Sequence, residues 1–170
     1  MRRAFASGGP MHRFALVLGA LVLVAGIAVA ASAPGPAPYD PSLDGWTQLQ
    51  TAGRKAVAEN RRVLVIVGGN WCKWCRALGR LMAGDAALEA KFGRYDVVHL
   101  NYSKENKNPE AMAHLGNPDK LGFPSLLVLS PQLKVLHTQS SEVFETGNSA
   151  KPGHDPAKLL GFLKRWDGTK

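Results

Sequence analysis

The most informative stretch of the chain is residues 63–75, which read VLVIVGGNWCKWC. It begins with five consecutive apolar residues, mostly β-branched, which stand between Arg61-Arg62 and a pair of glycines. An apolar run of this length with such boundaries predicts a strand that is buried on both faces of a sheet. Two cysteines three positions apart follow directly, and the sequence contains no others.

The spacing of Cys72 and Cys75 predicts a redox-active pair. We expect a helix from Cys72 to about Met82, on which residues i and i+3 face the same side, so the sulfurs can close a small disulfide ring or open to a dithiol. Backbone N–H groups and the helix dipole at the first turn favour a thiolate at Cys72. Cys72 is therefore the expected nucleophile, Cys75 resolves the mixed disulfide, and Lys73 helps to hold the Cys72 thiolate.

A structural disulfide and a metal site are the two other interpretations of the cysteine pair. A ring of four residues would constrain little of the unfolded chain, which argues against a purely structural disulfide. A closed zinc site usually needs four ligands. We expect no metal and no bound cofactor, because none of the histidines stands at ligand spacing from the cysteines: His12, His99, His114, His137 and His154.

The flanking sequence predicts an α/β fold with a central mixed β-sheet flanked by helices. An amphipathic helix capped by Asp44 precedes the first strand, and the strand-helix-strand order that follows suits a parallel pair. A later hairpin adds an antiparallel pair, and we expect the polar segment 140–155 to be a long surface loop. The remaining expected elements are helix 85–92, strand 96–102, helix 109–115, strands 125–129 and 133–138, and a final helix from Asp155-Pro156 to Trp166.

The N-terminus has the layout of a targeting segment. Residues 14–30 carry no charge and follow Arg2, Arg3 and Arg13, which is typical of a secretory signal. A run of roughly 17 to 25 apolar residues also spans a bilayer, so an uncleaved membrane anchor is the other interpretation. We therefore expect a signal peptide or anchor at 1–31, a Pro/Ala-rich linker at 32–42 and the folded domain at 43–170, in the periplasm or otherwise outside the cytoplasm.

The charge of the chain gives no indication of a nucleic-acid partner. The whole sequence has a net charge of +8, and removal of the three N-terminal arginines lowers it to +5. Lysines and arginines are scattered, without a basic run interleaved with aromatic residues, so we expect a solvated basic surface and no nucleic-acid binding.

The sequence resembles the thioredoxin superfamily. The likeness rests on the strand, on the Trp-Cys-x-x-Cys segment at a helix start, and on Gly122-Phe123-Pro124-Ser125 before a later strand. It implies a thioredoxin-like fold, with Pro124 in the cis form beside the cysteines and the backbone of Phe123 pairing with a substrate peptide. Trp71 matches a family position and is expected to contribute to substrate binding.

The resemblance also implies an activity. The expected function is exported thiol–disulfide exchange with protein thiols and disulfides as substrates, and a membrane or exported relay protein supplies or removes the electrons. A thioredoxin-like binding module or holdase without redox turnover is one alternative. A dithiol protein that handles copper is another, because two thiolates can hold Cu(I).

Four positions depart from the pattern of thioredoxins. Ile66 stands where they carry a buried aspartate, and His99 stands where they carry a lysine. His99 is therefore a candidate proton-handling group, and a histidine that merely faces solvent or is hydrogen-bonded in the strand is the other interpretation. Lys73-Trp74 replaces the Gly-Pro pair between the cysteines, and this dipeptide tunes the reduction potential in the superfamily. The direction of electron flow therefore stays open, since related proteins range from about −270 to about −120 mV.

Overall fold

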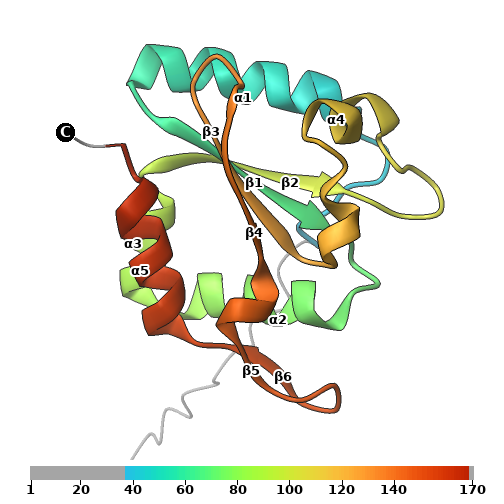
Figure 1. The fold of residues 1–170 in the computed structure, drawn as a ribbon, viewed down its shortest axis with the longest axis vertical. Helices are drawn as coiled ribbons and strands as arrows, with labels where there is room; N and C mark the ends of the chain where they lie inside the picture. The colour runs from blue at the N-terminus through green and yellow to red at the C-terminus, as the bar shows by residue number, and fades with distance from the viewer. Residues whose placement is uncertain (1–36, 169–170) are drawn as a thin grey trace, which may run out of the picture. The chain divides into compact units, whose positions relative to one another are not determined.

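A four-stranded mixed sheet forms the centre of the domain in the computed structural model, which describes residues 37–168. The strand order is β2-β1-β3-β4 (Figure 1). Strand β1 (Arg62–Gly68) runs parallel to β2 (Tyr95–Asn101) and antiparallel to β3 (Ser125–Leu129), which pairs antiparallel with β4 (Val135–Ser140). The mixed sheet and its parallel and antiparallel pairs are confirmed.

Strand β1 is buried on both faces, as its unbroken apolar sequence predicts. Val63, Val65 and Val67 belong to one hydrophobic core, whereas Leu64 and Ile66 belong to the other. Side chains alternate across a strand, so a central strand between two helical layers must be apolar at every position. The end of β1 is thereby fixed from both sides, and the cysteine segment starts from this end.

Helices cover the two faces of the sheet (Figure 1). Helices α1 (Gly45–Glu59) and α4 (Pro109–His114) line one core, and α2 (Lys73–Gly84), α3 (Ala86–Phe92) and α5 (Pro156–Trp166) line the other. The aspartates expected as N-caps of α1 and α5 accept backbone N–H groups of the first turn, as side chains at this position commonly do. A short 3-10 helix, η1 (Pro118–Leu121), was not expected from the sequence.

The segment 140–155 is not a long loop, and this expectation was wrong. It folds into a 3-10 helix, η2 (Ser141–Phe144), and a hairpin of β5 (Glu145–Gly147) and β6 (Pro152–His154). The hairpin packs against α2. The ring of His154 in the hairpin lies edge to face with the ring of Trp74 in α2, with the two centroids 5.7 Å apart. Strands of three residues are too short to produce an alternating pattern, which explains why the sequence did not reveal them.

The folded domain begins before the expected boundary. The predicted linker 32–42 includes Tyr39, but the side chain of Tyr39 is only 2% exposed and belongs to the core beneath the cysteines. Its backbone is held by Asn70 on both sides, so the spacer ends no later than residue 38. The predicted signal peptide or anchor at 1–31 lies outside the described residues. None of the helices among residues 37–168 is long and apolar enough to cross a membrane.

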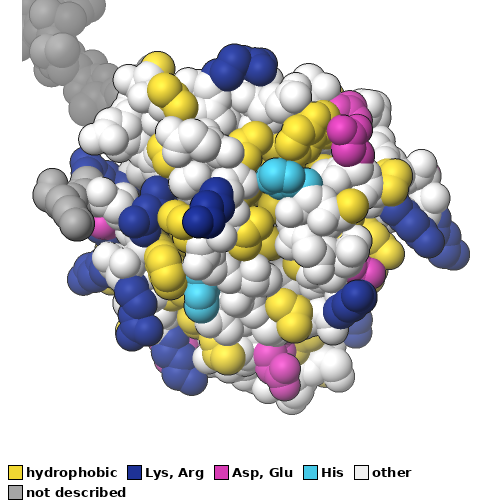
Figure 2. Space-filling model, turned by 45° about the horizontal axis from the view of Figure 1, so that its top comes forward, with side chains coloured by type: hydrophobic (Ala, Val, Ile, Leu, Met, Phe, Trp, Pro, Cys, Tyr) yellow, Lys and Arg dark blue, Asp and Glu magenta, His cyan; other side chains and the backbone are white. Residues whose placement is uncertain are grey.

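Basic side chains are dispersed over the surface. Figure 2 shows one face, on which lysine and arginine side chains stand in several separate places among uncharged groups. This distribution agrees with the scattered positions of these residues in the sequence.

The buried His154 makes the hairpin sensitive to acid. Neither ring nitrogen has a hydrogen-bond partner among the described residues, and burial lowers the pKa of His154 to about 4. The unfolded chain takes up this proton below about pH 6.5, so the stabilising effect of the neutral ring is present above that pH and is lost as the pH falls toward 4.

We predict that replacement of His154 by Phe flattens this pH dependence. Between about pH 7 and pH 4 the wild type should lose on the order of 2 kcal/mol more unfolding free energy than His154→Phe, because only the wild type has a ring to protonate. Urea unfolding at several pH values measures both curves. Parallel curves for the two proteins would contradict the assignment.

Candidate redox-active site

The two cysteines lie where β1 gives way to α2. Cys72 is the N-cap of α2, and its Sγ accepts the backbone N–H of Cys75 at 3.1 Å. Both side chains are free thiols, with 6% of Cys72 and 1% of Cys75 exposed. An N-cap side chain normally presents an oxygen to these N–H groups, so the sulfur of Cys72 occupies the anion position of the helix.

The environments of the two sulfurs differ. The thiol of Cys75 donates a hydrogen bond to the Cys72 sulfur, and this bond, with the N–H groups of Cys75 and Trp74 and the charge of Arg76, lowers the pKa of Cys72 to about 7 against the opposing effect of burial. The same bond to Cys72, together with burial, raises the pKa of Cys75 far above its ordinary value. Near neutral pH a large share of Cys72 is therefore in the thiolate form, whereas Cys75 keeps its proton.

Arg76, and not Lys73, supplies the nearby positive charge. The ammonium group of Lys73 donates to the backbone oxygen of Ser149 at 3.0 Å, which ties the start of α2 to the turn of the β5–β6 hairpin. Arg76 donates to the backbone oxygen of Asn70 at 2.7 Å and lowers the pKa of Cys72 by its charge. The expectation that Lys73 holds the thiolate is corrected accordingly.

The loop before β3 faces the cysteine pair. The Phe123–Pro124 peptide bond is cis, as the resemblance implies, and Cys72 in its protonated form donates to the carbonyl oxygen of Phe123 at 3.6 Å. The hydroxyl of the buried Ser125 bonds to the carbonyl oxygen of Gly122 at 2.7 Å, and Gly122 has a φ of 82°, which favours glycine. The loop therefore holds the backbone of Phe123 beside Cys72.

Aromatic side chains form a rim around Cys72. Trp71 is 57% exposed, and its indole N–H donates to the backbone oxygen of Tyr102 at 2.8 Å. The ring of Phe123 lies between Trp71 and Tyr102, at centroid distances of 5.5 and 5.1 Å. A hollow of about 360 Å³ opens beside this rim, and its lining is Trp71, Cys72, Lys73, Trp74, Phe123 and Ser149.

The arrangement is matched by a known family. A sequence model described as thioredoxin-like covers residues 45–131. This chain belongs to the thioredoxin-like family. The matched region includes β1, both cysteines and the cis proline, whereas Ser149 of the β5–β6 hairpin lies outside it.

Solved structures are similar to this chain as well. A disulphide isomerase from Xylella fastidiosa Temecula1 superposes with a TM-score of 0.55 at 23% identity, over 77% of this chain and 88% of that chain. A thioredoxin from Thermus thermophilus has a TM-score of 0.47 at 18% identity, over 75% of this chain and 84% of that chain. The first of these likenesses shows the thioredoxin-like fold. No curated protein sequence matches the chain.

Two thioredoxin-like positions are filled differently here, and they lie side by side. Ile66 of β1 is paired with His99 of β2 in the parallel register. His99 is half-buried, and burial lowers its pKa. Its ring meets the ring of Tyr39 edge to face, at a centroid distance of 5.4 Å. His99 therefore approaches the cysteine pair through Tyr39.

Three members of the site were not expected from the sequence: Tyr39, Arg76 and Tyr102. Tyr39 carries a signal that was available, because it is the one aromatic residue in the Pro- and Ala-rich stretch 31–41. Arg76 joins the site through its hydrogen bond to the backbone oxygen of Asn70, and Tyr102 through its ring contact with Phe123. Neither contact can be seen in the sequence. Among residues 37–168, no group of three or more His, Cys, Asp or Glu side chains has the geometry of a metal site.

We predict that removal of the Cys75 thiol raises the pKa of Cys72 above about 7, because the hydrogen bond from Cys75 is its largest stabilising contact. Alkylation of Cys72 falls as the pH drops below this pKa, so the rate profile of Cys75→Ala should move to higher pH. In Cys75→Ser a hydroxyl donor remains, and the profile should stay closer to that of the wild type. If both variants keep the wild-type profile, the Cys75 thiol does not stabilise the Cys72 thiolate.

Proposed function

We propose that this protein is a thiol–disulfide oxidoreductase that exchanges disulfides with protein thiols through Cys72 and Cys75. The observation that carries the proposal is the unequal pair of sulfurs at the start of α2, one with a pKa lowered to about 7 and one kept protonated. A thiolate attacks disulfides whereas a thiol does not, so this pair contains one attacking and one reserve sulfur at neutral pH.

The exchange proceeds in two steps. The Cys72 thiolate attacks one sulfur of a substrate disulfide, a mixed disulfide forms, and the other substrate sulfur leaves as a thiolate. Cys75 then attacks the Cys72 sulfur, the Cys72–Cys75 disulfide closes, and the second substrate sulfur leaves with the proton that Cys75 gives up. Two electrons pass from the protein to the substrate, and the reverse sequence oxidises a substrate dithiol.

The groups around Cys72 suit a polypeptide substrate. The carbonyl group of Phe123, positioned by the cis bond to Pro124, lies 3.6 Å from the Cys72 sulfur and offers a backbone acceptor beside it. Trp71 presents an exposed aromatic face on the same rim. We assign substrate binding to Trp71, Phe123 and Pro124, and tuning of the reduction potential to Lys73, Trp74 and His99.

The proposed setting is outside the cytoplasm. The support is the uncharged segment 14–30 behind basic residues, which suits a secretory signal or a membrane anchor. The chain has two cysteines and therefore no third thiol to pass electrons onward. We propose that a membrane-bound or exported relay protein supplies or removes the electrons of the Cys72–Cys75 pair after each turnover.

We predict that the protein accelerates reduction of insulin by a small dithiol and that Cys72→Ser lowers the rate to that of the dithiol alone, because the attacking sulfur is lost. In cells, Cys75→Ala should accumulate mixed disulfides with proteins outside the cytoplasm, because Cys72 still attacks but nothing resolves the product. Circular dichroism of both variants controls for folding.

Two results would contradict the proposal. Insulin reduction that is no faster with the wild type than with the dithiol alone would indicate a binding module in which the cysteines are incidental. Tight stoichiometric binding of Cu(I) by the reduced protein, without disulfide exchange, would indicate copper handling.

A further inference from the structure

Tyr39 enters the core directly beneath the redox pair. Its side chain is 2% exposed and shares a hydrophobic core with Cys72 and Cys75. The amide side chain of Asn70 accepts the N–H of Tyr39 at 3.3 Å and donates to its carbonyl oxygen at 2.6 Å. Asn70 lies in the turn that leads to Cys72, so the cysteine loop itself fixes the position of Tyr39.

The hydroxyl of Tyr39 and the sulfur of Cys75 meet above Gly68. A Cβ atom on Gly68 would lie 2.6 Å from the Cys75 sulfur and 2.9 Å from the Tyr39 hydroxyl oxygen, so both atoms occupy the space that a side chain would fill. From this position the Tyr39 hydroxyl, like the N–H of Gly69, lowers the pKa of Cys75, against the larger opposing effects of Cys72 and burial. A donor at this place therefore favours the thiolate form of Cys75.

We infer that Tyr39 is a positioning residue for the resolving step, in which its hydroxyl donates a hydrogen bond to the Cys75 thiolate as this sulfur attacks the mixed disulfide on Cys72. The inference rests on the proposed function and adds to it a group supplied from outside the family-matched region 45–131. In this step the Cys75–Cys72 bond forms, the bond from Cys72 to the substrate sulfur breaks, and the Cys75 proton ends on the departing substrate thiol.

The surroundings of Tyr39 explain why a hydroxyl serves here. Ile66 gives the strand beside the pair no carboxylate, and the titratable groups that face Tyr39 are Cys72 and Cys75 on one side and His99 on the other. Burial raises the pKa of Tyr39 well above 10, so the hydroxyl keeps its proton and remains a donor. Loss of a hydrogen bond to a buried charge is costly, which makes the effect of Tyr39 measurable.

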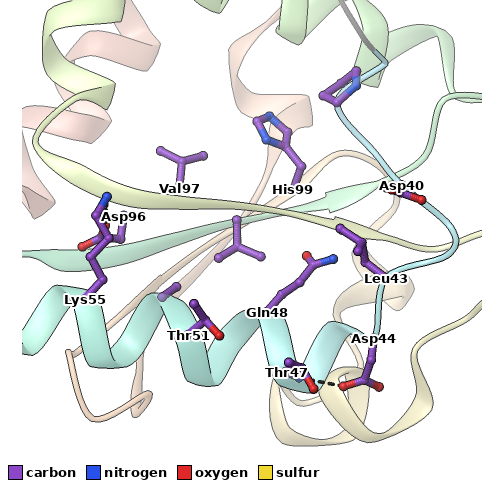
Figure 3. Close-up of a pocket in the computed structure, with 13 residues that line it drawn as sticks. Asp40, Leu43, Asp44, Thr47, Gln48, Thr51, Lys55, Asp96, Val97 and His99 are labelled. Atoms are coloured by element: carbon purple, nitrogen blue, oxygen red, sulfur yellow. Dashed lines mark hydrogen bonds and ion pairs between the residues drawn. The ribbon is translucent and has the colours of Figure 1, made fainter.

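His99 lies between Tyr39 and the edge of the sheet. It projects from β2 on the side away from α1 and lines an open hollow at the edge of the sheet, together with Asp40, Lys55 and Asp96 (Figure 3). The Tyr39 ring contacts His99 and not this hollow directly. The redox pair and the solvent-filled edge of β2 are therefore separated by two aromatic rings.

The test is a single-turnover reaction of the full-length reduced protein with an aromatic disulfide reagent whose leaving thiolate absorbs visible light. One leaving group is released when Cys72 attacks, and the second is released when Cys75 resolves. Tyr39→Phe keeps the ring and removes the hydroxyl. The matched control is Tyr95→Phe, which removes another buried hydroxyl, one that donates to the backbone oxygen of Leu163 away from the cysteines.

We predict that Tyr39→Phe leaves the first phase within about twofold of wild type and slows the second about tenfold to a hundredfold at neutral pH. The pH profile of the second phase should move to higher pH, because the Cys75 thiolate has lost a donor. Tyr95→Phe should match wild type in both phases.

The possible outcomes distinguish the role of Tyr39 from the proposed function. A normal second phase with an unshifted pH profile in Tyr39→Phe overturns the role of Tyr39 while the proposed function stands. Equal slowing of both phases in this variant also overturns it, since it indicates a displaced site instead of a lost donor. Absence of the first phase in the wild type overturns the proposed function itself.

Discussion

The hydrogen bond between the two sulfurs, at the first turn of α2, is the interaction on which the account of this protein depends. It places the negative charge on Cys72 and the proton on Cys75, and it exists because a helix brings residues three apart to the same side. The N–H of Cys75 adds to it by donating to the same sulfur at 3.1 Å. One cysteine is thereby ready to attack while the other is held back.

The rest of the fold keeps this bond in place. Strand β1 is packed from both faces, so its end cannot shift relative to the two cores. Asn70 then joins the cysteine loop to the backbone of Tyr39, and Arg76 closes the loop by a bond to the backbone of Asn70. The β5–β6 hairpin is tied to the start of α2 through Lys73. The sheet, the segment that contains Tyr39 and the β5–β6 hairpin therefore all support the first turn of α2.

The sequence predicted those parts of the fold that depend on local pattern. Three of these predictions depend on residues close together in the chain, and the structure has all three elements where they were expected. They are the buried strand β1, the aspartate N-caps of α1 and α5, and the helix that begins at Cys72. The cis bond at Pro124 came from the family resemblance, since the local sequence alone does not specify it. The parallel pair β1–β2 and the antiparallel pair β3–β4 followed from the succession of helices and strands, whereas the pairing of β1 with β3 was not predicted.

What the sequence did not reveal depends on contacts between distant residues. Tyr39 stands in a stretch whose composition is that of a spacer, and only its contacts with Asn70 and the cysteines make it part of the site. The hairpin strands are three residues long and lack a readable period. Lys73 was expected to act through charge on Cys72, but its side chain reaches the far end of the hairpin at Ser149.

A redox titration tests the central claim most directly. The protein is equilibrated with reduced and oxidised glutathione over a wide range of ratios, its remaining thiols are labelled, and the species are counted by mass spectrometry. The account predicts one two-electron transition from the dithiol to the Cys72–Cys75 disulfide, with little glutathione adduct, because Cys75 displaces glutathione from Cys72. Two thiols that stay free over the whole series, or a glutathione adduct on Cys72 that never closes to the ring, would contradict it.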